Sequence, residues 1–509
     1  MKYFKPTTLA LIALLSFSCQ DDDDTTIVTE PVNTEVNFQY KTTINVGGEA
    51  SAEISAFDSS TNKLFVTNVE SNEISIYNIS DLDTPVQETS ISLNAFGVPN
   101  SVSVSNGKLA IAVEANVKQN PGKILVYNTT DATLINEYTV GALPDMVTFS
   151  NNGNLIVSAN EGEPNADYTV DPMGTISIID LNDDSITTLD FTSFNTQEET
   201  LKSQNFRVFG PNASLAQDVE PEYITISDDS QTAWVSLQEN NGIAKVNLVT
   251  KTIETIYPLG YKDHMLPQNS LDASNDDGET VLKNWPVRGL YQPDAITYVN
   301  ILGTDYIISA NEGDAREYDG SPGYIGEERI KDLNLDPTAF PAIENFQDDA
   351  NLGRLKAMIS EGDTDNDGDY DVLYSYGARS FTIWNGNGAK VYDSGNSIAT
   401  ETLAATPANF NDGDGRSDDK GAEPESVEVL NLGNQRYILF VGLERTDQIM
   451  VYDITNPAAP VFLTILSHSG DEAPEGLLIV PAINSPNERD LLIVSNEDSG
   501  TVTIYENQQ

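Results

Sequence analysis

From residue 36 to its end, the chain consists of short apolar runs in which polar and hydrophobic side chains alternate, separated by Gly, Asn, Asp and Pro. The segments ISIYN (residues 74–78) and ILVYN (residues 124–128) show this alternation, which is typical of half-buried β-strands. We find no long segment with the period of an amphipathic helix. The pattern predicts an all-β protein.

The apolar runs belong to a repeating unit in which a strand is followed by a glutamate. These glutamates are Glu70, Glu114, Glu161, Glu239, Glu312, Glu444 and Glu497. The first three lie about 45 residues apart, close to the ~40–50 residues of a four-stranded propeller blade. Seven units predict a seven-bladed β-propeller, in which radial repetition removes long exposed sheet edges. An eighth blade within residues 315–395 is the alternative.

The two ends of the repeat region complement each other. The last unit stops one strand short after the alternating residues 501–505, whereas residues 36–46 alternate without an evident partner. We therefore expect an N-terminal strand to close the last blade. The propeller domain is expected to span residues 36–509, with insertions around 183–218, 258–290 and 315–370.

A second polar position occurs roughly twenty residues before each glutamate, usually as an acid beside a proline. These residues are Glu53, Asn100, Asp145, Glu222, Asp294, Glu425 and Glu475. In a propeller, the loop that enters the innermost strand and the loop that leaves the second strand lie on one face, near the central channel. Both sets are therefore expected at one mouth of the channel, where repulsion calls for cations, arginines or protonation.

We call this expected cluster of acids the acidic funnel, and its glutamates are candidate metal ligands. The strongest candidates are Glu161 and Glu312, each the fourth residue of a copy of the sequence SANEG. Arg316 and Arg445 are candidate counter-charges or clamps for a phosphate or carboxylate. Ordinary turn chemistry with solvation is the alternative interpretation, because polar residues are common in loops.

A second acidic motif, residues 362–371, places a carboxylate at every second position around a glycine. Its carboxylates are Asp363, Asp365, Asp367, Asp369 and Asp371. This spacing is typical of calcium loops, in which hard oxygens converge on the ion. Tyr374 stands at the twelfth position, where an EF-hand has a bidentate glutamate, so another acid would have to complete the site. A solvated acidic turn is the alternative, and residues 411–419 form a weaker candidate.

The composition restricts the class of partner. With 79 acidic and 26 basic residues, the formal net charge is −53, which repels nucleic acids and anionic membranes and favours cations. The chain has two histidines and one cysteine, so zinc, copper and haem sites are not expected. No Gly-x-Ser-x-Gly or nucleotide-binding glycine motif occurs.

The N-terminus predicts export. Lys2 and Lys5 precede an apolar stretch too short to span a bilayer, and residues 1–18 have the pattern of a signal peptide. The following Cys19 lies in a sequence that resembles the lipobox of bacterial lipoproteins, although Ser16 departs from it. Residues 19–35 form an acidic linker. We expect a lipid anchor on Cys19 and an outer-membrane or cell-surface location, with an incidental cysteine as the alternative.

Several longer motifs point to one family, among them residues 158–164, 171–180, 309–316, 362–371, 377–381, 416–424, 442–445 and 451–457. The chain resembles the choice-of-anchor I domain proteins, which are related to mesenchyme-specific cell surface glycoprotein. The resemblance implies a propeller held at a cell surface, and the family is linked both to calcium-rich mineral surfaces and to proteins described as alkaline phosphatases.

Together these observations predict a monomeric, lipid-anchored surface module that binds calcium and an unknown ligand or surface partner through the acidic funnel. Other metal ions remain possible. The alternative is a metal-dependent phosphoesterase, in which the funnel carboxylates hold metal ions that activate water and Arg316, Arg379 or Arg445 steadies the phosphate.

Overall fold

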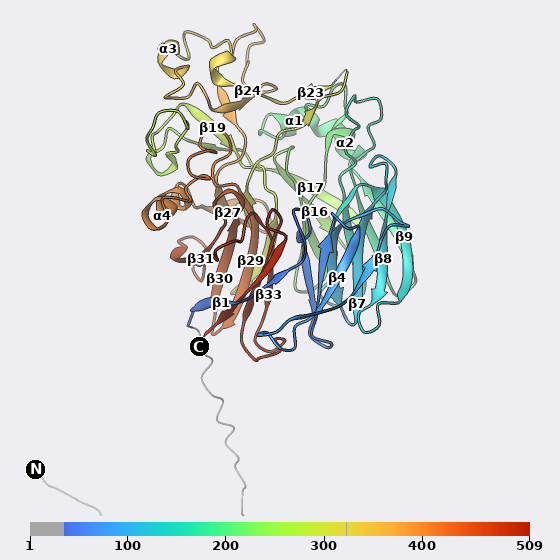
Figure 1. The fold of residues 1–509 in the computed structure, drawn as a ribbon. Coiled ribbons are helices and arrows are strands. Elements are labelled where there is room, and N and C mark those ends of the chain that lie inside the picture. Colours follow the sequence, from blue (N-terminus) through green and yellow to red (C-terminus); the bar gives the residue numbers. More distant parts are fainter. Residues whose placement is uncertain (1–34, 322, 509) are drawn as a thin grey trace, which may run out of the picture.

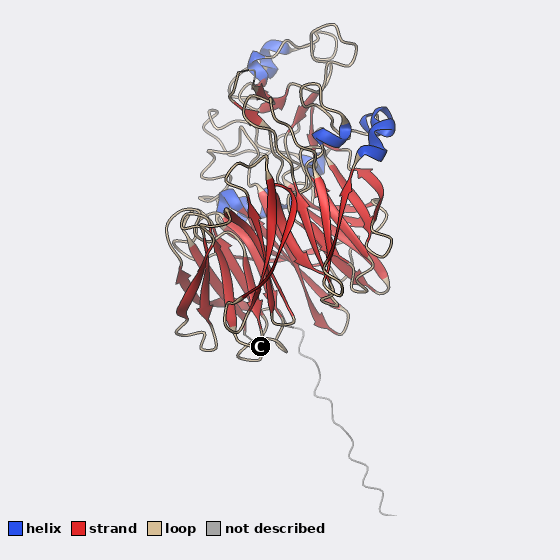
Figure 2. Ribbon diagram, turned by 90° about the vertical axis from the view of Figure 1, so that its right-hand side faces the viewer, coloured by secondary structure: helices blue, strands red, loops and turns tan. Residues whose placement is uncertain are grey.

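The computed structural model describes residues 35–321 and 323–508, and these residues fold as an all-β protein. The expected signal peptide and Cys19 lie outside the described residues. Seven four-stranded antiparallel sheets make up most of the fold, and a cap of shorter elements covers one end of them (Figures 1 and 2). The chain is therefore a β-propeller.

The first three sheets follow one another along the chain. They consist of β2 (Ser55–Asp58), β3 (Lys63–Asn68), β4 (Glu73–Asn78) and β5 (Val86–Ser92); β6 (Val98–Ser105), β7 (Lys108–Glu114), β8 (Pro121–Asn128) and β9 (Leu134–Ala142); and β10 (Pro144–Phe149), β11 (Leu155–Asn160), β12 (Thr175–Asp180) and β13 (Ser185–Asp190).

The next three sheets are separated by longer connections. They consist of β14 (Ile224–Ile226), β15 (Thr232–Leu237), β16 (Gly242–Asn247) and β17 (Thr252–Pro258); β20 (Ile296–Ile301), β21 (Thr304–Asn311), β27 (Ser380–Asn385) and β28 (Lys390–Asp393); and β29 (Pro424–Gly433), β30 (Arg436–Leu443), β31 (Gln448–Asp453) and β32 (Val461–Leu466).

The seventh sheet joins both ends of the described chain. Its strands are β33 (Pro474–Val480), β34 (Leu491–Asn496), β35 (Thr501–Asn507) and β1 (Phe38–Asn45). Strand β1 pairs antiparallel with β35, in a register that opposes Phe38 to Asn507 and Asn45 to Thr501. The segment Phe38–Asn45 thus supplies the outer strand of the sheet that contains β35, the last described strand.

The innermost strands contact one another in the order β2, β6, β10, β14, β20, β29 and β33, and β33 contacts β2 again. The cores lie between neighbouring sheets: Leu64 and Val66 of β3, for example, pack in one cluster with Leu491 and Ile493 of β34. All four side chains are buried. A sheet between two neighbours is buried on both faces, which explains why the middle strands are apolar at successive positions.

The cap is built from three insertions and one further helix. The first carries η1 (Thr192–Gln197), α1 (Glu198–Lys202) and α2 (Leu215–Asp218); the second β18 (Tyr261–Asp263), η2 (Pro267–Asn269) and β19 (Val287–Leu290); the third β22 (Glu317–Tyr318), β23 (Tyr324–Ile325), β24 (Glu327–Arg329), η3 (Ile330–Asp332), α3 (Ile343–Phe346), β25 (Lys356–Met358) and β26 (Leu373–Ser375); and the helix is α4 (Ser397–Ala405).

The sheet topology adds detail at two of the expected insertions. Residues 185–190 are the outer strand β13, so the first insertion begins only after them. Strands β27 and β28 complete the sheet of β20 and β21, and the described residues of 315–395 form no additional four-stranded sheet. No helix among the described residues is both long and apolar enough to cross a membrane.

Candidate functional site: an acidic channel mouth

At four inner strands, the polar residue that follows a proline at the start of the strand sits in a β-bulge. The pairing of β6 with β7 skips one residue after Pro99, and β33 with β34 skips one after Pro474. The same irregularity follows Pro144 and Pro424, with two residues skipped. The skipped positions include Asn100, Asp145, Glu425 and Glu475. A bulge redirects a side chain out of the ladder, and here it aims these side chains at the channel.

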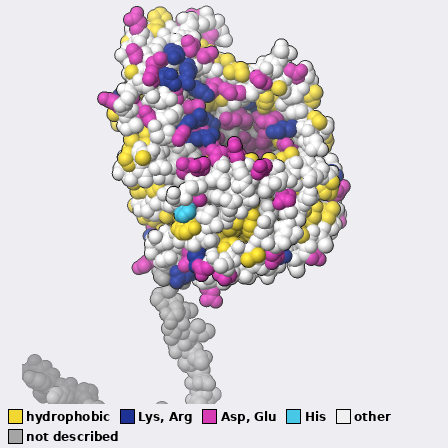
Figure 3. All heavy atoms as spheres, viewed as in Figure 1, with side chains coloured by type: hydrophobic (Ala, Val, Ile, Leu, Met, Phe, Trp, Pro, Cys, Tyr) yellow, Lys and Arg dark blue, Asp and Glu magenta, His cyan; other side chains and the backbone are white. Residues whose placement is uncertain are grey.

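These side chains line a cavity of about 360 Å³, called here the acidic chamber. Of the described residues, one cation, Lys118, and eight carboxylates line it; the carboxylates are Glu53, Glu114, Asp145, Glu161, Glu163, Asp294, Glu425 and Glu475. Figure 3 shows a hollow in which Asp and Glu side chains gather, with Lys and Arg at its margin. Members of both polar series predicted from the sequence therefore meet at one mouth.

Glu161 and Glu312 occupy equivalent places because the two SANEG copies build the same local network. Asn160, which ends β11, accepts a hydrogen bond from the Ser158 hydroxyl and donates to Ser177 of β12. Asn311, which ends β21, likewise accepts from a serine and donates to β27. The glycine after each glutamate has a positive φ, 74° for Gly162 and 86° for Gly313. The sequence SANEG therefore occurs at the ends of both β11 and β21 because each copy directs its glutamate toward the channel.

Burial dominates the electrostatics of the mouth. It raises the pKa of Glu53 to about 8, with further contributions from neighbouring carboxylates. Burial, followed by the charge of nearby acids, also raises the pKa values of Glu161, Glu425 and Glu475 well above their usual range. One carboxylate oxygen of each of Glu222, Glu239 and Glu425 is buried without a hydrogen-bond partner. The mouth thus holds more carboxyl groups than its own cations can neutralise, and burial favours the protonated forms of these groups as long as no further cation is bound.

Glu312 lies where two acidic groups meet. Its Oε2 accepts a hydrogen bond of 2.8 Å from Gln238, and its Oε1 lies 2.5 Å from the ammonium of Lys420. Asp294, Glu312 and Glu425 each offer a carboxylate oxygen within 4.8 Å of the others, as do Glu312, Glu423 and Glu444. Carboxylate oxygens suit hard cations such as calcium, magnesium or manganese.

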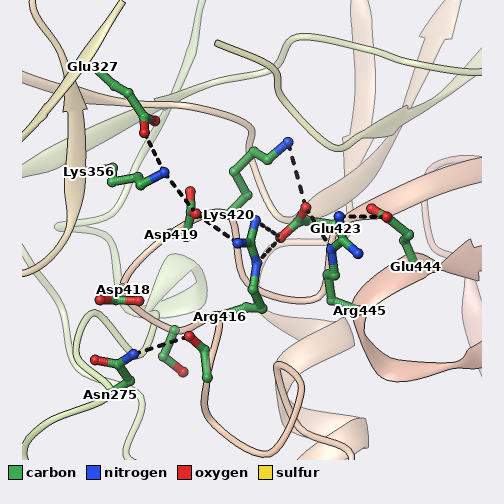
Figure 4. A network of polar contacts seen from close by, with 12 residues as sticks. Asn275, Glu327, Lys356, Arg416, Asp418, Asp419, Lys420, Glu423, Glu444 and Arg445 are labelled. Atoms are coloured by element: carbon green, nitrogen blue, oxygen red, sulfur yellow. Dashed lines mark hydrogen bonds and ion pairs between the residues drawn. The ribbon is translucent and has the colours of Figure 1, made fainter. Parts of the chain in front are cut away.

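Three cations surround Glu423 in the second of these groups (Figure 4). Its carboxylate lies 2.8 Å from Arg416, 3.4 Å from Arg445 and 3.6 Å from Lys420, and the side chain is fully buried. Arg445 also contacts Glu444, which begins the short helix η4 (Glu444–Thr446), at 2.7 Å. Burial lowers the pKa of Lys420, but the nearby carboxylates outweigh it and hold that pKa well above its usual value. This group is therefore already neutralised by the protein.

The structure places the other candidate arginines in structural contacts. Arg316 is 4% exposed and pairs with Asp218 at 2.8 Å and with Glu220 at 2.7 Å. Arg379 donates to the backbone carbonyls of Asp272, Ser417 and Asp419. Both guanidinium groups brace the cap. Arg445, whose side chain is 35% exposed, has the most accessible guanidinium of the three candidates.

The aspartate loop lies in the cap, in the exposed connection between β25 and β26. Backbone amides of Asp367 and Gly368 donate to the Asp363 carboxylate, which shapes the turn. Two groups of carboxylates share Asp371, one with Asp363 and Asp365 and one with Asp336 and Asp369. Asp336 comes from outside the motif.

Two further observations refine the loop candidates. Tyr374 occupies the position at which an EF-hand has a metal-binding glutamate. Its hydroxyl accepts a hydrogen bond from Arg288 and is therefore engaged away from the loop. In the weaker candidate, residues 411–419, Asp418 and Asp419 form ion pairs with Arg354, Lys356 and Arg416. The aspartate loop is therefore the better candidate cation site of the two, because its carboxylates form no ion pair with a basic side chain of the described residues.

Both histidines lie apart from these acidic groups. The Nδ1 of His264 lies 2.6 Å from the carbonyl oxygen of Asn269, and burial lowers the His264 pKa to about 3. His468 stacks on Tyr40 of β1. The described metal-ligand groups therefore consist of carboxylates alone.

Several residues of the mouth carry no signal in the repeat pattern. Lys420 and Glu423 belong to the irregular segment before β29, and Gln238 follows β15. Glu163 could have been recognised from the sequence, because it is an acid two residues after Glu161. Lys420 reaches Glu312 across 108 residues of sequence, a contact that only the fold reveals.

A family model for the choice-of-anchor I domain matches residues 53–457. The chain is also 33% identical to Gigasin-3a of Magallana gigas over an alignment 192 residues long, with coverage of 32% of this chain and 67% of the relative. Similar solved structures include hydrazine synthase of Kuenenia stuttgartiensis, with 10% identity, a TM-score of 0.47 and coverage of 90% of this chain and 96% of the other. The Swd1 β-propeller domain of Myceliophteria thermophila gives 7% identity, a TM-score of 0.46 and coverage of 93% and 100%.

Proposed function

Because the chain belongs to the choice-of-anchor I family, we propose that it is a cell-surface β-propeller whose acidic channel mouth binds calcium and, through it, a surface ligand. The observation that carries this proposal is the acidic chamber, in which eight carboxylates face one lysine. Confining so many carboxylates in a partly buried space is unfavourable. A divalent cation would relieve the repulsion between them and would be coordinated by carboxylate oxygens that have no hydrogen-bond partner. We also infer that the seven sheets are seven blades of one ring closed by β1.

The aspartate loop is proposed as a second calcium site. Its two overlapping carboxylate groups and its glycine turn fit a cation that accepts six to eight oxygens in flexible geometry. The loop is exposed and lies in an insertion, so a cation there would order the cap, whereas a cation in the mouth would stabilise the ring.

The test is to measure calcium binding by titration calorimetry after removing the loop site with Asp363→Asn and Asp365→Asn. The proposal predicts that this loop variant loses part of the calcium binding and keeps the rest in the acidic chamber. Loss of all calcium binding in the folded loop variant would show that the mouth is not a cation site.

Anchoring through Cys19 remains a proposal of its own, motivated by the lipobox-like sequence. Cys19→Ser is expected to abolish incorporation of a fatty-acid probe, since that residue is the sole thiol of the chain. Unchanged labelling of the serine variant would refute lipid attachment at this residue.

A metal-dependent phosphoesterase is the second candidate function. It is favoured by a second cavity of about 340 Å³, lined by Arg316, Lys356, Arg416 and Lys420 as well as by carboxylates. Hydrolysis of an aryl phosphate with calcium and iron supplied distinguishes the two functions. A binding module shows no turnover, whereas metal-dependent turnover that collapses in a folded Glu161→Gln, Glu312→Gln variant would establish the enzyme instead.

A further inference from the structure

We propose that Asp294, Glu312 and Glu425 form the cation site of the mouth, and that Lys420 is an internal competitor for it. This inference rests on the proposed cation binding at the mouth and assigns it to one group of residues. It also gives Lys420 a role that neither the family match nor the chamber by itself suggests.

The three carboxylates are held by the backbone of two neighbouring sheets. Asp294 precedes β20, Glu312 follows β21 and Glu425 lies at the start of β29. The Asp294 amide donates to Ala310 of β21, and the Ala295 amide donates to the carbonyl of Glu425. Hydrogen bonds between strands therefore fix the spacing of the three side chains before any ion binds.

Glu425 supplies the observation that points to a ligand. Its side chain lines the acidic chamber, the residue is 9% exposed, and its Oε2 is buried without a hydrogen-bond partner. Within the described chain, neither Asp294 nor Glu425 has a lysine or arginine nitrogen within ion-pair distance. A buried carboxylate oxygen without a partner is costly, and coordination to a cation would satisfy it.

The neighbouring group makes the assignment specific. Glu423 and Glu444 already contact Arg416, Arg445 and Lys420, so a cation there would have to displace several ion pairs. Glu312 belongs to both groups. On the Asp294 side, the one basic side chain of the described residues that contacts the group is Lys420, whose ammonium lies at Glu312 Oε1.

A divalent cation bound at Glu312 would repel the Lys420 ammonium from its present position. A calcium ion bound at ~2.3–2.6 Å from a Glu312 oxygen would lie within a few ångströms of the ammonium. Two positive charges that close repel strongly even at the effective dielectric constant of a protein surface. Lys420 also contacts Asp314 at 3.4 Å and Glu423 at 3.6 Å, which offers the ammonium alternative partners after it leaves Glu312.

The experiment uses the folded loop variant, Asp363→Asn with Asp365→Asn, as background and measures calcium affinity by calorimetry. Glu425→Gln is expected to weaken binding at least about tenfold, whereas Glu444→Gln, the matched change in the neutralised group, leaves it within about twofold. Lys420→Gln is expected to strengthen binding at least about tenfold, and Lys420→Arg, which keeps the charge, is expected to leave it nearly unchanged.

A second measurement does not depend on the folding of any variant. Calcium is expected to increase the acylation rate of Lys420, followed by mass spectrometry, because the ammonium is released from Glu312. Lys123, a surface lysine paired with Glu137, serves as the internal control. Retained calcium binding with equal effects of the two Gln variants, or without any response of Lys420, would overturn this inference while leaving cation binding at the mouth intact. Absence of calcium binding in the loop variant itself would remove the proposed function as well.

Discussion

The ammonium nitrogen of Lys420 lies 2.5 Å from Oε1 of Glu312, although 108 residues separate the two along the chain. Glu312 stands at the mouth of the channel, at the end of β21, and Lys420 belongs to the connection that leads into β29. Their contact connects two acidic groups: Asp294, Glu312 and Glu425, for which Lys420 is the one ion-pair partner among the described residues, and Glu312, Glu423 and Glu444, which Arg416 and Arg445 also neutralise. The Lys420–Glu312 contact is therefore where the proposed cation site borders the ion pairs that stabilise the mouth.

The first prediction concerns the pH dependence of stability. Burial raises the pKa of Glu53 to about 8 and that of Glu428, deeper in the channel, to about 7. Both exceed the ordinary value of 4.5, so the folded state holds these protons more tightly, and stability is lost as pH rises from about 5 through 8. Thermal melts of the metal-free protein should show a falling Tm across this range.

A substitution tests the cause of that slope. Glu53→Gln should stabilise the metal-free protein at pH 8 relative to wild type by about 1 kcal/mol or more, while Glu49→Gln, an exposed control, should not. The relevant measure is the difference between the Tm values at pH 5 and pH 8. An equal difference in wild type and Glu53→Gln would argue against this role of Glu53.

The second prediction concerns the calcium loop. Asp365→Asn should remove much of the rise in Tm that calcium produces in the cap, because Asp365 belongs to a group with Asp363 and Asp371. Asp367→Asn makes the same charge change in the same loop but outside both groups. The measurement is the calcium-induced rise in Tm of each variant. An equal reduction of this rise in both variants would mean that the loop acts only through its net charge.

The third prediction concerns the brace of the cap. Arg316→Met leaves Asp218 and Glu220 buried without a counter-charge and should cost about 3–5 kcal/mol of unfolding free energy. Arg489→Gln breaks an ion pair at a side chain that is 41% exposed and should cost less than about 1 kcal/mol. Urea unfolding measures both. A loss near 1 kcal/mol for Arg316→Met would show that the pair is not a structural brace.

The fourth prediction concerns closure of the ring. Phe38 of β1 is buried and meets Phe440 of the neighbouring sheet edge-on, with ring centroids 5.0 Å apart. Phe38→Ala should cost about 3–5 kcal/mol, whereas the exposed neighbour Gln39→Ala should be nearly neutral. Chemical unfolding with limited proteolysis of the N-terminus provides the readout. A stable, protease-resistant Phe38→Ala variant would contradict a closing role for β1.

Much of the fold could be predicted from the sequence because each repeat carries its own local signals. Alternating side chains predict the strands, and the recurring Pro–acid pairs mark the places where the inner strands bulge, as at Pro424 and Glu425. Asn160 and Asn311 play the same role in both SANEG copies, so their similarity reflects equivalent geometry. The convergence of acids could be inferred because it follows from the repeat.

The specific partners could not be predicted in this way. Arg316 is a candidate anion clamp by sequence, but Asp218 at the end of α2 and Glu220 in the irregular segment after it are two buried acids that already pair with it. Lys420 and Glu423 lie in an irregular connection without periodicity, and their contacts depend on how distant insertions pack. Asp336 joins the aspartate loop through tertiary structure, not through the spacing of the motif.

The most direct test of the central claim is the position of bound ions in crystals soaked with terbium, whose anomalous scattering marks calcium-type sites. We predict an anomalous peak at the edge of the acidic chamber, between Glu312 and the two chamber-lining residues Asp294 and Glu425, in addition to any peak at the aspartate loop. Glu425→Gln crystals should lose the first peak and keep the second. A wild-type crystal with terbium at the loop and none in the chamber would contradict the account.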